Sequence, residues 1–169
     1  SRDTAVVRLS VLPPLPTYLS QPNATGDEIN EGSIGARLAV GTFEMFFTGD
    51  GEVEANNRWR TTYASYSRAV DVLKVGHHGA NNAIFDTGNS GASSWLDHTA
   101  PSVSVISANG TTHPRLNAVT RLLQRSNHRT FCTNVQGDIT IQVTPDSRFT
   151  VTVQRSPERN CVAGSEATT

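Results

Sequence analysis

The feature that most constrains this chain is a pair of adjacent histidines directly after an apolar segment. Residues 69–75 read Ala-Val-Asp-Val-Leu-Lys-Val, which predicts a buried strand, and Gly76, His77, His78 and Gly79 follow it. A strand that ends in two imidazoles holds both in a fixed position. A metal or catalytic site requires side chains that are held in this way.

Two other predicted strands also deliver an acidic residue or a histidine just past their ends. The apolar residues 43–47 precede Asp50, and residues 102–107 lead to His113. Strand ends along one edge of a sheet can point several side chains at one place. Carboxylates and imidazoles are ligands of hydrolytic metal centres. The three strand ends together therefore predict a hydrolytic metal site.

Each of these residues also has an ordinary structural interpretation. Asp50 lies between two glycines, and aspartate suits both turns and helix N-caps. The histidine pair by itself is compatible with a loop, and His113 with the first turn of a helix that has no chemistry. His98 and His128 stand outside the pattern, and we interpret both as ordinary polar side chains.

The segments around these residues resemble a known family. The sequences FFTGD, DVLKVGHHGA, APSVSVISANGTTHP and TNVQGDITI, together with Asn30 and Ser33 upstream, occur in the order and spacing of that family. They resemble the later half of the metallo-β-lactamase-like domain of the ComEC competence DNA-uptake proteins. The resemblance covers residues 6–143. It implies an α/β fold, as the C-terminal half of an αββα sandwich whose active site lies between its two halves.

One family motif has no counterpart in this chain. The earlier half of the family carries His-x-(His/Asp)-x-Asp-His, and none of the five histidines has that spacing. We therefore expect residues 1–155 to be the later half alone, followed by a disordered tail over 156–169. The expected partner is an N-terminal half, in the same precursor or as a second chain.

The resemblance also implies roles for individual residues around two divalent metal ions, zinc first and manganese or iron as alternatives. Asp50 is the candidate bridging carboxylate, His77 a ligand of the second ion, and His78 its neighbour or substitute. The missing motif would supply the other ligands. The candidate substrate-side residues, which would bind phosphate oxygens near a helix N-terminus, are Ser107, Asn109, Thr112 and His113.

These roles predict a metal-dependent phosphodiesterase or nuclease that acts on DNA and is inactive as this chain alone. The alternative is a non-catalytic binding or structural module that keeps the fold without the metal. The formal net charge of −1 gives no nonspecific electrostatic attraction to nucleic acid. No apolar run is long enough to span a membrane.

The composition favours an extracellular or periplasmic protein. The chain has one lysine, Lys74, many Ser, Thr and Asn residues, and two cysteines, Cys132 and Cys161. Two cysteines are too few for a disulfide scaffold, and whether they pair depends on the order of the strands.

Hydrophobic periodicity and turn residues predict alternating strands and helices, which is typical of the α/β class. The expected strands are 4–12, 33–40, 42–47, 69–75, 102–107, 130–133, 138–143 and 149–153. The expected helices are 52–69, a short one that begins at Trp95 and ends at Pro101, and 113–123. Residues 15–31 and 81–94 are expected to be loops.

Overall fold

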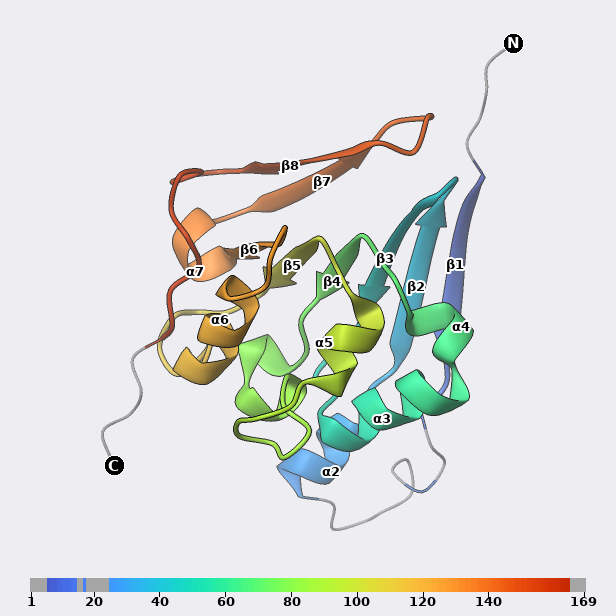
Figure 1. Cartoon of the computed structure of the whole chain (residues 1–169), viewed down its shortest axis with the longest axis vertical. Helices are drawn as coiled ribbons and strands as arrows, with labels where there is room; N and C mark the ends of the chain where they lie inside the picture. The colour runs from blue at the N-terminus through green and yellow to red at the C-terminus, as the bar shows by residue number, and fades with distance from the viewer. Residues whose placement is uncertain (1–5, 15–16, 18–24, 165–169) are drawn as a thin grey trace.

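The computed structural model describes residues 6–14, 17 and 25–164 and contains a six-stranded mixed sheet (Figure 1). The strands lie side by side in chain order: β1 Val7–Leu12, β2 Gly35–Val40, β3 Phe43–Phe47, β4 Val72–Lys74, β5 Val103–Ile106 and β6 Arg129–Cys132. The pairs β1–β2 and β2–β3 are antiparallel, whereas β3 to β6 are all parallel. The carboxyl ends of β3, β4 and β5 therefore meet at one edge of the sheet.

Short helices connect the parallel strands, which confirms the predicted α/β class. The helices are α2 Gly26–Glu31, α3 Val53–Thr62, α4 Ala64–Ser67, α5 Ser94–Thr99, α6 Leu116–Leu123 and α7 Thr133–Gln136, with 3₁₀ turns η1 His77–Gly79 and η2 Asn81–Ala83. Figure 1 shows α3, α5 and α6 on one side of the sheet. No helix of the described residues is long and apolar enough to cross a membrane.

The main core lies between these helices and the sheet. Its centre is an aromatic cluster of Phe46 from β3, Trp59 from α3 and Trp95 from α5, all almost fully buried. The Phe46 ring centroid lies 5.6 Å from each tryptophan, and the two tryptophans are 5.8 Å apart. Tilted and edge-to-face contacts of this kind add to the free energy gained by burying the rings.

A separate hairpin covers part of the opposite face of the sheet. Its strands, β7 Ile139–Val143 and β8 Phe149–Val153, pair antiparallel, and Figure 1 shows them on the side away from the helices. Phe149 packs on Phe43 with ring centroids 5.1 Å apart. Other apolar residues of β7 and β8 pack on β3 to β6, so this layer forms a second apolar cluster.

The same face is apolar but open to solvent over β1 and β2. In the register of the sheet, Leu9 lies opposite Leu38, which lies opposite Met45 of the second cluster. Val7, Leu9 and Val11 of β1 share one face and are 65, 62 and 58% exposed. Ile34, just before β2, is 54% exposed. We call these four residues the β1 apolar row.

The C-terminal segment is attached to the sheet by a disulfide between Cys132 and Cys161. Gln136 Nε2 donates to Arg159 O at 2.7 Å, and Asn134 Nδ2 donates to Val162 O at 3.1 Å. The segment expected to be disordered from residue 156 thus has defined contacts as far as Gly164. Residues 165–169 lie outside the described residues.

Most predicted elements are present, and the differences have local causes. Helix α2 lies inside the expected loop 15–31, of which residues 15, 16 and 18–24 lie outside the described residues. It begins with a capping box, in which Thr25 Oγ1 accepts from Glu28 N and Glu28 Oε2 accepts from Thr25 N. The expected helix 52–69 is broken at Tyr63 into α3 and α4. Two β-branched threonines precede this break, and such residues have low helix propensity.

Two further boundaries differ from the prediction. Helix α6 begins at Leu116 and not at His113. Thr133, predicted as the end of a strand, begins the single turn α7. The two residues of the expected strand 4–12 that precede Val6 lie outside the described residues.

Candidate functional site

The loops after β3, β4 and β5 pack together at the carboxyl edge of the parallel strands. His77 N donates to Gly49 O at 3.3 Å, and Thr48 Oγ1 donates to Lys74 O at 2.7 Å. A Cβ atom on Gly76 would lie 2.5 Å from Gly51 O, so only glycine allows this approach. These strand ends place Asp50 and the histidines at one edge of the sheet.

Asp50 and His78 face each other across two of these loops. His78 Nε2 lies 3.7 Å from Asp50 Oδ1, and both side chains are close to half exposed. The other ring nitrogen, Nδ1, lies 2.7 Å from Ser107 O. A carbonyl oxygen only accepts, so Nδ1 carries the proton of the neutral ring and Nε2 presents its lone pair on the Asp50 side.

The three histidines after β4 and β5 form one group. The ring centroids of His77 and His113 are 5.4 Å apart, and His78 lies 6.4 Å from each of them. His77 and His78 both have positive φ angles, of 40° and 52°. This region of backbone conformation is unfavourable for residues other than glycine, and strained residues cluster at functional sites.

Glu52 is the site residue that sequence reasoning missed. Its carboxylate is almost fully buried and accepts from Asn30 Nδ2 at 2.8 Å and Asn82 Nδ2 at 2.6 Å. His77 Nδ1 lies 2.7 Å from Glu52 Oε1, although the ring is turned so that the contact lacks hydrogen-bond geometry. Burial raises the pKa of Glu52, which the hydrogen bond from Asn30 and the charge of His77 oppose.

Glu52 lies behind His77 and is itself held by Asn30 and Asn82. The Glu52 carboxylate lies against His77 Nδ1, which leaves the other ring nitrogen for a ligand. In many metal sites a carboxylate lies on this side of a histidine ligand. The segment around α2 contributes here, since Asn30 binds Glu52 and Ser33 Oγ accepts from Asp50 N at 3.1 Å. The acidic residue two positions after Asp50 was the signal in the sequence, but its burial was not visible there.

Replacing Glu52 with glutamine should lower the free energy of unfolding by about 1 to 3 kcal/mol. The amide would turn an N–H₂ group toward one asparagine donor, so a buried donor would lose its acceptor. Urea unfolding of the purified chain measures the change. The exposed Glu158→Gln is the control and should leave the midpoint unchanged. Equal midpoints for the two variants would contradict the role given to the buried carboxylate.

The predicted substrate-side residues line one hollow beside His78. It has a volume of about 320 Å³ and is lined by His78, Ser107, Ala108, Asn109, Thr112 and His113. Asn109 Oδ1 accepts from Thr111 N at 2.9 Å, which folds the loop into a tight turn. The four residues expected to bind phosphate oxygens thus surround one space next to the Asp50–His78 pair.

His113 is partly buried at the edge of this hollow. Burial, and then the charges of His77, Arg115 and His78, lower the pKa of His113, so its ring is neutral near neutral pH. Thr112 Oγ1 lies 3.2 Å from His113 Nδ1. The helix whose N-terminus was expected at His113 begins later, and Ala118 N of its first turn donates to Asn81 Oδ1 at 3.2 Å. The prediction that His113 opens a helix whose N-terminus attracts anions is therefore wrong.

Lys74 is a cation near Asp50 that was not predicted as a site residue. Its Nζ donates to Val75 O at 2.8 Å and to Gly49 O at 3.5 Å. Burial lowers the pKa of Lys74, and the charge of Asp50 opposes this shift. These contacts stabilise the backbone of the loops that carry Asp50 and His77.

The other two histidines lie apart from this group. His98 Nε2 lies 2.9 Å from Ser67 Oγ, and its ring stacks on Trp95. His128 Nδ1 lies 2.8 Å from Pro101 O. Both take part in packing of the helical side, and burial lowers the pKa of each.

The donor types at the site suit a transition metal, since carboxylate and imidazole bind zinc, manganese and iron. Within residues 6–14, 17 and 25–164, however, no group of three or more His, Cys, Asp or Glu side chains is placed to hold an ion. Asp50 and His78 are a carboxylate and an imidazole that face each other there.

Searches against protein-family models and curated proteins both gave no match.

Proposed function

We propose that this chain is the C-terminal half of a metallo-β-lactamase-like αββα sandwich that hydrolyses phosphodiesters, with DNA as the expected substrate. The observation that carries the proposal is the meeting of Asp50, His77, His78 and His113 at the ends of three parallel strands. A hollow lined by Ser107, Asn109 and Thr112 lies directly beside them. Rigid strand ends that converge on a polar hollow are the usual architecture of a catalytic site.

The residues of this chain would divide the work as follows. Asp50 and His78 would hold a divalent ion, with His77, which lies beside Glu52, as a further ligand. Two such ions, zinc first and manganese or iron as alternatives, would activate water as a nucleophile near neutral pH. His113, neutral and partly buried, would stay on the substrate side and hydrogen-bond a phosphate oxygen, together with Thr112 and Asn109.

The partner in this proposal is an N-terminal half of the same fold, which would add the remaining ligands and cover the β1 apolar row. That row continues an apolar face whose other part is already covered by β7 and β8. Monomeric proteins rarely leave such a strip exposed unless it is an interaction surface. β1 is also the edge of the described sheet, where unpaired backbone groups favour association.

The chain without its partner should therefore self-associate through the β1 apolar row. Replacing Val7 and Leu9 with lysine should shift the population toward monomer, because apolar contact at two positions of the row is lost and charge repulsion is added. Sedimentation velocity at several concentrations measures the effect. Leu116→Lys, at a residue 55% exposed on α6, is the matched control and should leave association unchanged. If the unmodified chain is a monomer at all concentrations, the β1 apolar row is not an association surface.

The test of the proposed function is metal content and hydrolysis of bis(p-nitrophenyl) phosphate by the complete protein. We expect about two ions per protein and metal-dependent turnover that a chelator removes. A complete protein without metal and without turnover would favour the second candidate, a non-catalytic binding or structural module. This second candidate is favoured by one observation: among the described residues, no group of three or more His, Cys, Asp or Glu side chains is placed to hold an ion.

We also propose an extracellular or periplasmic location. The buried Cys132–Cys161 disulfide supports it, because disulfides persist mainly in oxidising compartments.

A further inference from the structure

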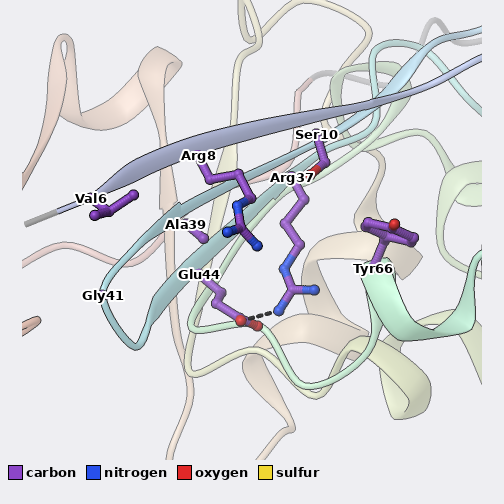
Figure 2. A pocket seen from close by; sticks show the side chains of 8 residues that line it. All are labelled: Val6, Arg8, Ser10, Arg37, Ala39, Gly41, Glu44 and Tyr66. Atoms are coloured by element: carbon purple, nitrogen blue, oxygen red, sulfur yellow. Dashed lines mark ion pairs between the residues drawn. The ribbon is translucent and has the colours of Figure 1, made fainter.

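A second hollow lies at the opposite end of the sheet from the histidine group. It includes Gly41, in the turn before β3, whereas Asp50 follows the end of β3. Its volume is about 280 Å³. Figure 2 shows its polar lining, which comes from β1, β2, β3 and α4 and consists of Arg8, Ser10, Arg37, Glu44 and Tyr66.

Arg37 forms a fixed wall of this hollow. Its Nη2 forms an ion pair with Glu44 Oε1, and its Nη1 donates to Ser65 O at 2.8 Å. These two contacts hold the Arg37 side chain in one orientation. The side chain is 19% exposed and therefore still faces solvent in part. An arginine fixed in this way binds an anion with little further loss of side-chain entropy.

Arg8 supplies a second cation on the same face. In the register of the sheet it lies opposite Ala39, which lies opposite Glu44, so a small residue leaves space between the two charged side chains. Figure 2 shows the Arg8 and Arg37 side chains extending toward Glu44 from neighbouring strands. Among the described residues, no hydrogen-bond or ion-pair partner of the Arg8 guanidinium is found. Two guanidinium charges against one carboxylate leave a net charge of +1.

Tyr66 adds a flat apolar surface to the hollow. It lies on α4 and is 42% exposed. Aromatic side chains favour offset-stacked or edge-to-face contact with other aromatic rings. The lining thus combines two guanidinium groups that can bind an anion with an aromatic surface that can contact a planar group.

We propose that this hollow binds a compact ligand with an oxyanion head, a carboxylate or a phosphate ester, and a planar body. The oxyanion accepts hydrogen bonds from Arg8 and Arg37, since guanidinium groups match both head groups in shape and charge. The planar body lies against Tyr66. The site is separate from the histidine group and does not rest on the proposed function.

Isothermal titration calorimetry on the full chain with four probes tests this proposal. Phenylphosphonate and benzoate carry a ring and an oxyanion, inorganic phosphate lacks the ring, and benzyl alcohol lacks the charge. We expect dissociation constants of about 0.1 to 1 mM for the better ring-bearing anion. Phosphate should bind more weakly, and benzyl alcohol should show no measurable binding. Which of phenylphosphonate and benzoate binds more tightly identifies the head group.

Variants locate the binding. Arg8→Gln should weaken the better probe at least about tenfold, and Tyr66→Ala should weaken the ring-bearing probes but leave inorganic phosphate unchanged. Arg148→Gln, at an arginine 85% exposed in the turn between β7 and β8, is the control and should have no effect. The proposal would be overturned if neither ring-bearing anion binds at 10 mM. It would also be overturned if binding survives Arg8→Gln, and loss of binding in His113→Ala would then place the anion at the histidine group.

Discussion

Replacing Asp50 with alanine in the complete protein should abolish phosphodiester hydrolysis and remove at least one metal ion. Asp50 Oδ1 lies 3.7 Å from His78 Nε2, and the two side chains form an ion pair when the histidine is protonated. A carboxylate that bridges two ions has no substitute in the site, so turnover should fall to background. Metal analysis and the rate of bis(p-nitrophenyl) phosphate hydrolysis measure the two effects. Full activity in Asp50→Ala would overturn the metallohydrolase proposal.

The histidine variants separate ligands from substrate contacts in the same experiment. His78→Ala and His77→Ala should both lower metal content and rate, since the first faces Asp50 and the second is a proposed ligand beside Glu52. His113→Ala should keep the metal and lower turnover or raise the Michaelis constant. Asp97→Ala, at a carboxylate 70% exposed on α5, is the control and should change neither quantity. Loss of metal in His113→Ala, with retention in His77→Ala, would reverse the assigned roles.

Replacing Cys132 and Cys161 together with serine should lower the free energy of unfolding by about 3 to 4 kcal/mol. The disulfide spans 29 residues, and the estimate follows from the loop-closure entropy that such a cross-link removes from the unfolded chain. Urea unfolding of the oxidised protein and the double variant measures the difference. Adding reductant to the double variant is the control and should have no further effect. A difference below about 1 kcal/mol would contradict this estimate.

Loss of the disulfide should also disturb the site. Gly164 N donates to Pro114 O at 2.8 Å, and a Cβ atom on Gly164 would lie 2.9 Å from His113 O. The C-terminal segment therefore packs closely on the backbone of His113. Without the cross-link this packing should loosen, and chemical-shift changes at His113 in the double variant would report it.

The sequence was sufficient to predict the ends of the strands, because the signals for them are local. Apolar runs before Gly49, Gly76 and Ala108 mark the ends of β3, β4 and β5, and these ends do meet in the fold. The reason is that strand periodicity and glycine-rich turns are properties of short segments. The capping box at Thr25 is also a local signal, but the prediction of a loop over 15–31 overlooked it, and helix α2 was missed for that reason.

Some boundaries could not be read from local patterns. The start of α6 at Leu116 depends on a side chain from elsewhere in the chain. Asn81 Oδ1 accepts from Ala118 N in the first turn of α6. Such contacts shift the ends of helices by several residues because they replace or supply terminal hydrogen bonds.

What the sequence by itself determined is the α/β class, the order of the strands along the chain and the set of polar residues at three strand ends. Tertiary structure alone decided which of these residues touch. Glu52 is a buried acceptor only because Asn30 and Asn82, 22 and 30 residues away, reach it. Cys132 and Cys161 pair because the last segment returns beside β6. These contacts join distant segments, and no short-range pattern in a sequence encodes such distances.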